Sequence, residues 1–507
     1  MINKKLNKLK VKLYHKSVDI LRRYRYPEKY KTLGFLCNYI NDEDFYLTDG
    51  AKALHNRIIT RICTPNSWDF PRNCICLCNN EEDADNAINC HAAVIISEVQ
   101  YKNYPSIVAK NPLAIYAKLC RYYRDLQKNI SVTAVIGSIG KTTTKNMIGA
   151  VYSSKWQTYY TSANDNTYKT IGFAVQHIPP LAEKMIQEVH EGTPHQTQYL
   201  SQMLNPDIAV ITAIDKSHIS RFNDSDGIIK EVCSITKHMK DDGVVIINID
   251  EFTRFDLLNG KKTITISTVS KEADFYAEDI LILESGLQFR IVVKESHESY
   301  SITLNNIFAK HNVICALYAF AVGFYNHAEP VTMVKALSSF KTEGARQNII
   351  RTENDIVIYA DCYNAIARSI KSAIDAASCI PIKGKRIMVL GDIEEAGDIS
   401  ETMHQETVEL VNKSNFDALL TLGEKMKKAV VNTTFRDSLC VHHFSSISEL
   451  STKIKEIVNN GDLILFKASN ASNLSSCIKI VWPKVYEKMF DSFIKEYNNY
   501  KRNSLLY

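Results

Sequence analysis

Short apolar runs alternate with stretches of helical periodicity along most of the chain. In the first part, strands are expected over residues 74–78, 92–96, 105–108, 131–136, 208–213, 243–248 and 263–267. Helices are expected between them, over residues 82–90, 112–126, 144–151 and 311–324. The segments 281–293 and 299–304 have the period of two that is typical of a hairpin. In the last part, strands are expected over 356–360, 386–390, 418–422 and 463–467, with helices over 369–377 and 448–458.

This alternation of strand and helix predicts α/β domains with parallel sheets. A chain of 507 residues suggests about three such domains, and its apolar and charged fractions are ordinary for globular proteins. We place a basic helical extension at 1–45, a small α/β domain at 46–128, a central domain at 129–328 and a second open α/β domain at 329–507. In the central domain, a nucleotide is expected at the carboxyl ends of the strands.

The charge of the chain is unevenly distributed. Residues 1–31 contain eleven Lys and Arg residues against Asp19 and Glu28, whereas the whole chain carries only +5. The remainder is therefore slightly acidic, which argues against binding to nucleic acid. Leu6, Leu9 and Leu13 recur near helical spacing in this basic segment. Two interpretations stand: a helix that contacts an anionic membrane or a protein partner, or a helix that packs on its own domain.

The cysteines indicate a reducing compartment. There are thirteen, an odd number, and they are scattered without paired spacing. Cys74, Cys76 and Cys78 alternate at period two, which favours a buried strand over a metal site. No secretory signal and no apolar run long enough to span a bilayer is evident, so we expect a cytoplasmic protein.

Residues 131–151 contain the clearest chemical motif. A β-rich run is followed by Gly137-Ser138-Ile139-Gly140-Lys141-Thr142-Thr143 and then by an apolar-periodic helix. Glycines let backbone N–H groups approach a phosphate, a lysine reaches the terminal phosphates and a hydroxyl holds Mg²⁺. The eight-residue form of this loop would have glycine where Val135 stands. The strand before and the helix after favour a nucleotide-binding loop over a coincidental turn.

Further segments, in order along residues 46–480, resemble the Mur ligases, and most of all their D-alanyl-D-alanine-adding branch. The loop at 137–143 matches the family's G-x-x-G-K-T-T, and His311-Asn312 matches its H-N pair. Pro206-Asp207 to His218 resembles a strand and loop of the family. Two segments are more specific for the branch: Asp361-Cys362-Tyr363-Asn364-Ala365, and Gly391-Asp392 with Glu395, Gly397 and His404.

The resemblance implies three domains: a small N-terminal domain for the UDP-sugar, a central P-loop ATPase domain with a parallel sheet, and a C-terminal Rossmann-like domain. It also implies an ATP-dependent, amide-bond-forming enzyme of peptidoglycan synthesis, with ATP and Mg²⁺ as cofactors. The substrates would be a carboxylate, which is phosphorylated, and an amine, an amino acid or dipeptide, which attacks the acyl phosphate. We expect a monomer.

The resemblance also implies roles for single residues. Lys141 would neutralise phosphate charge, and Thr142, Glu188 and His218 would hold magnesium, with Lys141, Glu188 and His218 as the catalytic set. The nucleotide would further contact Gly137, Ser138, Gly140, Thr143 and Asn312, and after domain closure Arg346, Asp361, Tyr363 and Asn364. Lys467 matches the lysine of a terminal K-G-S-R. Each of four residues also has a possible role without function: a surface carboxylate for Glu188, a loop histidine for His218, core packing for Tyr363 and a structural lysine for Lys467.

Several positions depart from the family pattern. Val232 stands where most members have a carbamylated lysine that bridges the magnesium site, and Lys230 should face elsewhere on its helix. The uridine-contacting motif is not recognisable, Thr64-Pro65-Asn66-Ser67 being the nearest stretch, and Asn470 replaces an arginine. Two main hypotheses result: a divergent ligase, which the retained nucleotide residues favour, or a non-catalytic ATP-binding scaffold, which Val232 favours. An unrelated P-loop ATPase or kinase would not explain residues 361–404.

Overall fold

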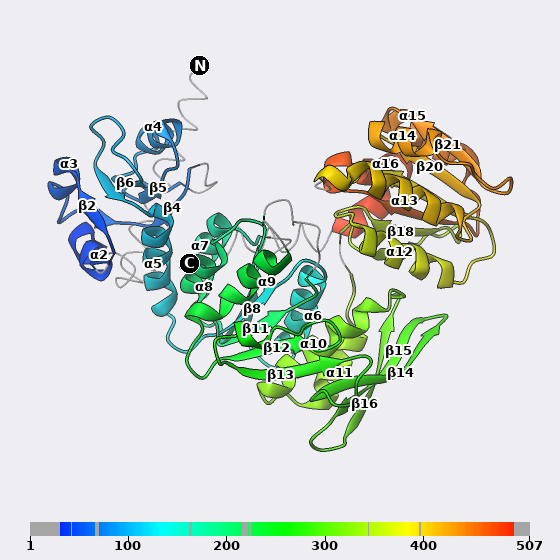
Figure 1. Cartoon of the computed structure of the whole chain (residues 1–507), viewed down its shortest axis with the longest axis horizontal. Helices are drawn as coiled ribbons and strands as arrows, with labels where there is room; N and C mark the ends of the chain where they lie inside the picture. Colours follow the sequence, from blue (N-terminus) through cyan, green and yellow to red (C-terminus); the bar gives the residue numbers. More distant parts are fainter. Residues whose placement is uncertain are drawn as a thin grey trace.

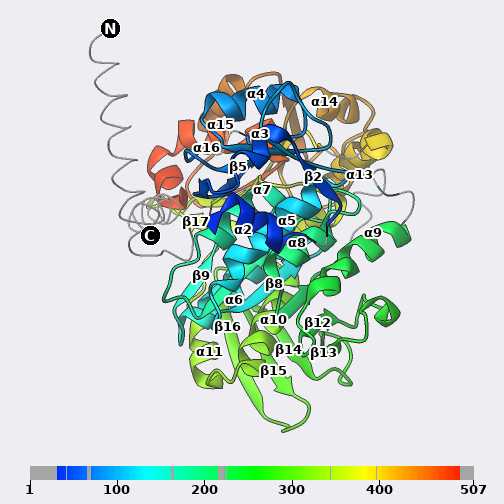
Figure 2. The ribbon, with the colours of Figure 1, turned by 90° about the vertical axis from the view of Figure 1, so that its left-hand side faces the viewer.

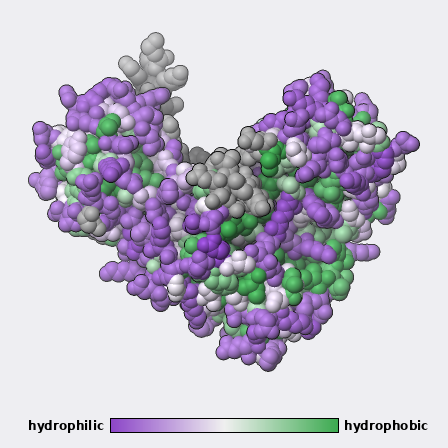
Figure 3. All heavy atoms as spheres, in the orientation of Figure 1, coloured by the Kyte–Doolittle hydropathy of each residue, from purple (hydrophilic) through white to green (hydrophobic). Residues whose placement is uncertain are grey.

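The computed structural model describes residues 31–490 except 42, 66–69, 162–164, 215–221, 223–224, 343 and 395–396. Three domains follow one another along the chain, and the central domain joins the other two (Figure 1). The space-filling view shows the two outer domains well apart at their far ends (Figure 3). The basic segment 1–30 and His218 lie outside the described residues. Among the helices that are described, none combines the length and the apolar composition needed to cross a bilayer.

The N-terminal domain is a small sheet covered by helices. Its strands lie in the order β2 (Phe45–Leu47), β7 (Ser106–Ala109), β6 (Val94–Ser97), β5 (Ile75–Leu77) and β4 (Ile62–Cys63), parallel except for β2. A second, antiparallel pair consists of β1 (Lys31–Thr32) and β3 (Ile58–Ile59). The helices are α2 (Leu33–Tyr39), α3 (Asp49–Lys52), α4 (Glu81–Asn89) and α5 (Pro112–Asp125). Because Leu33, Leu36 and Ile40 are buried in this core, the described residues between 31 and 45 belong to the domain and not to an extension, which corrects the expected boundary.

The central domain is a doubly wound sheet with an antiparallel end. Its strands lie in the order β9 (Thr158–Tyr160), β10 (Lys184–Glu188), β8 (Ser131–Ile136), β11 (Ile208–Ile211), β12 (Val244–Asn248), β13 (Lys262–Ser267), β14 (Phe275–Leu283), β15 (Gly286–Val293) and β16 (Ser299–Asn305). The pairing is parallel from β9 to β14 and antiparallel from there to β16. The expected hairpin is therefore wrong in detail: the run 281–293 contains the end of β14, a turn and all of β15.

Helices cover both faces of the central sheet around β8, β11 and β12, which explains why these strands are almost continuously apolar. In β8, Val132, Ala134 and Ile136 face one core and Val135 faces the other. One face is covered by α5, α7 (Tyr168–Gln176), α8 (Thr197–Leu204) and α9 (Ser225–Cys233), the other by α6 (Lys141–Ser153), α10 (His311–Tyr325) and α11 (Pro330–Ser338). Short 3₁₀ turns are η3 (Ser234–His238) and η4 (Phe255–Leu257). Met333 and Leu337 of α11 lie in the central core, so the packing of this domain continues past the expected boundary at 328.

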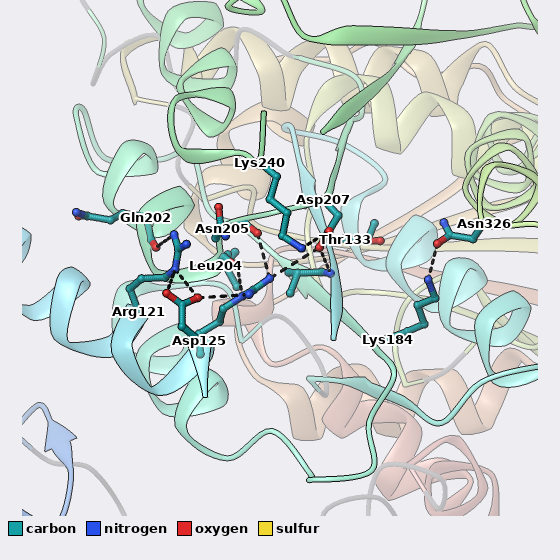
Figure 4. A network of polar contacts seen from close by, with 12 residues as sticks. Arg121, Asp125, Thr133, Lys184, Gln202, Leu204, Asn205, Asp207, Lys240 and Asn326 are labelled. Carbon is teal, nitrogen blue, oxygen red and sulfur yellow. Dashed lines mark hydrogen bonds and ion pairs between the residues drawn. The ribbon is translucent and has the colours of Figure 1, made fainter. Parts of the chain in front are cut away.

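Helix α5 fastens the N-terminal domain to the central one. It packs against α7 and α8, as the turned view also shows (Figure 2). Figure 4 shows polar contacts at its end, among them that of Arg121 with Asp125. Arg124, 4% exposed, donates to the backbone oxygens of Leu204 at 2.9 Å and Asn205 at 3.3 Å. Asp207 accepts from the backbone N–H of Val132 at 2.7 Å and pairs with Lys240. These contacts lie at the ends of β8 and β11 away from the nucleotide loop.

The C-terminal domain has its own cores on both faces of a second sheet. The strand order is β17 (Asn348–Arg351), β18 (Val357–Asp361), β22 (Leu463–Lys467), β19 (Arg386–Gly391), β20 (Ala418–Leu422) and β21 (Cys440–Phe444), parallel except for β17. The helical segments are α12 (Ala367–Cys379), η5 (Gly397–Ile399), α13 (Ser400–Asn412), α14 (Glu424–Val431), α15 (Ile447–Ile457), η6 (Asn470–Ser472) and α16 (Ser475–Val481). Phe308 and Ala309, just before α10, reach into this domain's core.

All thirteen cysteines are described, and all are free thiols. Cys74, Cys76 and Cys78 are buried, with Ile75–Leu77 forming β5, so the alternating cysteines belong to a buried strand as predicted.

Candidate nucleotide site

The loop between β8 and α6 has the backbone conformation that its glycines predict. Gly137 has φ +130° and Gly140 has φ +84°, both in the left-handed range that favours glycine. A Cβ on Gly137 would stand 2.3 Å from the hydroxyl of Thr212. The backbone N–H groups of Ser138 and Ile139 donate to the carbonyl oxygen of Ala213, at 2.8 and 3.2 Å, which ties the loop to the end of β11. Helix α6 begins at Lys141, three residues earlier than its apolar pattern predicted, because the loop ends directly in the helix.

Lys141 points back over the loop that precedes it. Its Nζ donates to the carbonyl oxygen of Gly137 and to both carboxylate oxygens of Glu191, at 3.0 and 3.1 Å. The Glu191 side chain is completely buried, and that of Lys141 is 13% exposed. A lysine at the start of a helix that follows a glycine loop is suited to bind phosphate oxygens.

Glu188 ends β10 and is held by two donors. The hydroxyl of Thr142 donates to one carboxylate oxygen at 2.7 Å, and the amide of Asn166 donates to the other at 2.9 Å. Burial alone would raise the pKa of Glu188, but the nearby positive charges of Lys145, Lys141 and Arg346 and the hydrogen bond from Thr142 more than offset it and lower the pKa below its usual value. The carboxylate is therefore charged at neutral pH. A carboxylate next to a hydroxyl is the oxygen donor set that a hard divalent cation prefers.

The C-terminal domain supplies the opposite wall. The Arg346 guanidinium stacks on the ring of Tyr363, 3.6 Å from its centroid. Asp361, at the end of β18, pairs with Lys467 of β22 at 2.9 Å, and Lys467 also donates to the carbonyl oxygen of Asn364 at 2.6 Å. Lys467 is 1% exposed, so this ion pair is buried and it holds the strand ends together.

A cavity of about 590 Å³ lies between the two domains and collects most of the expected residues. Its walls include Ser138, Gly140, Lys141, Thr142, Thr143, Glu188, Arg346, Asp361, Tyr363 and Asn364. This size falls in the usual range of small-molecule sites. Gly137 and Asn312 are outside the lining.

Asn312 lies behind the residues that line the cavity and supports them through hydrogen bonds. It is fully buried and donates to the side-chain oxygen of Gln347 at 2.9 Å and to the carbonyl oxygen of Ala309 at 3.0 Å. Its neighbour His311 lines the cavity and contacts Gln347 and Ser372 of the C-terminal domain, each at 2.8 Å. Burial lowers the pKa of His311 to about 4, so its ring is neutral. Together they join the central domain to the C-terminal domain.

Two residues of the signature around Gly391, Asp392 and His404, make hydrogen bonds that hold the loop after β19. The Asp392 carboxylate accepts from the backbone N–H of Met426 at 2.9 Å, near the start of α14. His404, 1% exposed, accepts from the N–H of Ile393 at 2.9 Å and contacts the carbonyl oxygen of Ser400 at 2.6 Å. These contacts fix the loop after β19, from which Glu394 reaches the cavity. Glu395 lies outside the described residues, as do Asn66 and Ser67 of the stretch 64–67.

Helix α9 shows why no lysine of that helix reaches the site. Val232 is completely buried in the central core. Lys230 is exposed and pairs with Asp226 one turn earlier at 2.6 Å, as the helical spacing predicted.

Sequence reasoning missed Glu191, Gln347 and the role of Asn166 as a partner of Glu188. Glu191 had one usable signal: it follows Glu188 by three residues, just past a strand end where ligand sites form in α/β sheets. The strand itself, Lys184–Glu188, mixes polar and apolar residues and gave no clear pattern.

The residues present fit a nucleotide and a divalent cation. Among the described residues, the Ser138 hydroxyl is buried in the loop without a hydrogen-bond partner. The glycine cradle leaves backbone N–H groups near the helix start, and Thr142 and Glu188 offer the oxygens for a cation. Fold and site together define a P-loop nucleotide-binding α/β protein whose site is completed by a second domain.

Comparison with known proteins identifies the family. Residues 135–323 match the Mur ligase middle domain, and residues 345–470 match the Mur ligase, glutamate ligase domain. The chain is 32% identical to the UDP-N-acetylmuramoyl-tripeptide–D-alanyl-D-alanine ligase of Bacillus subtilis, over 75% of this chain and 81% of the relative. It is 22% identical to the ligase of the same name from Escherichia coli, over 76% and 84% of the two chains. The chain belongs to the Mur ligase family, whose members are ATP-dependent ligases.

Solved structures agree on the fold. The structure of MurF from Acinetobacter baumannii superposes with a TM-score of 0.74 at 21% identity, covering 89% of this chain and 98% of that one. MurF ligase from Thermotoga maritima, solved in complex with ADP, superposes with a TM-score of 0.69 at 20% identity, over 84% and 98%. The three-domain Mur ligase architecture expected from the sequence is therefore confirmed.

Proposed function

We propose that this ligase joins D-alanyl-D-alanine to a UDP-N-acetylmuramoyl-tripeptide at the expense of ATP, with Mg²⁺ bound by Thr142 and Glu188. The proposal takes its substrates from the names of the relatives, and above all from the 32% identity to the Bacillus subtilis ligase over 81% of its length. The cavity between the two domains supports it, because Lys141 and Glu188 face Arg346 and Asp361 there.

The chemistry would proceed in two transfers. The tripeptide carboxylate attacks the terminal phosphorus of ATP, so that ADP leaves and an acyl phosphate forms. The amine of the dipeptide then attacks the acyl carbon, phosphate leaves, and the nitrogen loses a proton to give the amide. Mg²⁺ supplies charge neutralisation of the phosphates in such transfers.

The residues of this chain would position the reactants and neutralise the charge of the phosphates. Lys141 would contact the terminal phosphates, and the glycine loop would donate backbone N–H groups to them. Arg346, held on the ring of Tyr363, would approach the same phosphates from the second domain. His218 is proposed as a further metal ligand, on the resemblance alone. Holding the reactants in line, between two domains that exclude water, is the main source of rate in such an enzyme.

The test is a reconstituted reaction. Protein, ATP, Mg²⁺, UDP-N-acetylmuramoyl-tripeptide and D-alanyl-D-alanine are mixed, ADP release is followed, and the product mass is checked. ADP release that requires both substrates, and that is lost in Lys141→Ala, supports the proposal. Exposed Lys371→Ala, whose partner is Asp375 on the same helix, is the matched control. ATP binding without turnover on any of the tripeptide and amine substrates would refute it.

One observation favours a second candidate, a non-catalytic ATP-binding scaffold. Val232 fills the core at the position that aligns with the family's bridging lysine, so this position offers no ligand to the metal. The same reaction separates the two candidates, because a scaffold binds ATP without releasing ADP.

A further inference from the structure

The lysine of the nucleotide loop already has a counter-ion inside the protein. Lys141 Nζ lies 3.0 and 3.1 Å from the two carboxylate oxygens of Glu191, and it also donates to the carbonyl oxygen of Gly137. Among the described residues, Lys141 is the only side chain that donates to this carboxylate. The cation expected to attract phosphate is thus neutralised before any nucleotide arrives.

Glu191 lies behind the lysine and outside the wall of the cavity. Its side chain is completely buried and does not line the cavity, whereas Lys141 and Glu188 do. The two carboxylates at the end of β10, Glu188 within the strand and Glu191 just after it, therefore differ in position. Glu188 faces the cavity and bonds to Thr142, where a cation would bind, whereas Glu191, within the described part of the chain, reaches the cavity only through Lys141.

The electrostatic consequence follows from burial. A buried charge is poorly screened, so the Glu191 carboxylate opposes an approaching phosphate more strongly than a surface carboxylate would. The phosphates of a nucleotide without a cation have to compete with the Glu191 carboxylate for the ammonium group of Lys141. A nucleotide whose phosphates are already neutralised by a divalent cation meets less opposition from Glu191.

We propose that Glu191 is a positioning residue that makes nucleotide binding depend on the divalent cation. It acts through Lys141, by holding the ammonium over the loop and by cancelling part of its charge. This inference rests on the proposed nucleotide site, and it adds to that site a residue that couples the two ligands.

The test measures the affinity for ADP by titration calorimetry, with Mg²⁺ and with a chelator instead. Glu191→Gln keeps the size of the side chain and an oxygen that accepts from Lys141, but removes the charge. Without Mg²⁺, the variant is expected to bind ADP roughly tenfold more tightly than the unaltered protein. The ratio of the ADP affinity with Mg²⁺ to the ADP affinity with chelator should therefore fall by the same factor. Glu278→Gln, which removes a partly buried carboxylate of β14 paired with Lys271 and Arg290 away from the cavity, is the control that should keep the original ratio.

The outcomes are distinct. An unchanged ratio in a folded Glu191→Gln, or weaker binding of free ADP, overturns the inference while leaving the nucleotide site intact. If that variant does not fold, Glu191→Met also removes the charge with a side chain of similar length, and the same shift is expected. If neither the unaltered protein nor the variants bind ADP at all, the proposed function fails and the inference fails with it.

Discussion

The hydroxyl of Thr142 donates to the carboxylate of Glu188 at 2.7 Å, from the first turn of α6 to the last residue of β10. The two residues are far apart in the sequence and meet because β8 and β10 are neighbouring parallel strands. Both groups offer oxygen to a divalent cation, and neither needs to move far to do so.

Removing one of these oxygens should raise the Mg²⁺ concentration that the reaction needs. Thr142→Val keeps the shape of the side chain but leaves Glu188 without its hydroxyl partner. The rate at saturating substrates is expected to fall about 10²-fold, comparable with the loss of one group that stabilises transition-state charge. A Mg²⁺ titration of ADP release checks this. Thr158→Val, which alters a hydroxyl of β9 that donates to the carbonyl oxygen of Trp156 and does not line the cavity, should leave the Mg²⁺ dependence nearly unchanged.

Stability should fall in acid partly because of Glu188. Its pKa lies below the ordinary value of 4.5 in the folded protein, so between the two values the unfolded chain binds more protons. The stabilisation is therefore complete above about pH 4.5 and is lost as the pH falls through the folded pKa. Urea unfolding at a series of pH values should show a shallower loss in Glu188→Gln than in the unaltered protein. Equal slopes in the two proteins would contradict this assignment.

The backbone of the loop should not tolerate a side chain at Gly137. Gly137→Ala combines φ +130° with a Cβ 2.3 Å from Thr212 Oγ1, so we expect a loss of more than about 2 kcal/mol and a loss of ADP binding. Gly260→Ala is the matched control, because its φ is also positive, at +66°, but its Cβ would meet no atom within 4 Å. That change should cost only about 1 kcal/mol of backbone strain and leave ADP binding intact. Thermal unfolding and calorimetry measure both effects.

Replacing only one partner of the buried ion pair between Asp361 and Lys467 should lower the free energy of unfolding strongly. Lys467→Met leaves the Asp361 carboxylate without its cation, which is expected to cost about 3–5 kcal/mol of stability. The double variant Asp361→Asn/Lys467→Met should recover part of this, since no unpaired charge remains. If the single and double variants lose the same stability, the ion pair is not what holds β18 to β22. Chemical unfolding of all four forms of the double-mutant cycle gives the answer.

Strands were predictable from sequence where both faces of the sheet are buried. Residues 131–136, 418–422 and 463–467 were located to the residue, because a strand covered by helices on both sides is apolar throughout. Lys184–Glu188 and Cys440–Phe444 were missed, since polar residues interrupt the apolar pattern there. The turn before Gly286 was hidden inside one apolar run.

The candidate site could be predicted as far as local motifs reach. The loop at 137–143 specifies its own glycine conformation and helix start, and Asp361 and Tyr363 came from a contiguous segment. Glu191 and Gln347 act through partners 50 and 36 positions away in the chain, Lys141 and His311. Nothing local marks such a residue, because its role is set by the order of the strands and by the approach of the second domain.

The shared core around α5 has a consequence for how the chain loses its structure. Residues of the N-terminal sheet and of one face of the central sheet form a single apolar cluster, from Leu33 to Leu258, and Arg124 adds buried polar contacts to it. The C-terminal sheet has separate clusters. The first two domains therefore form one cooperative unit, and the N-terminal domain cut off after Asp125 would expose an apolar surface that only the rest of the chain can cover.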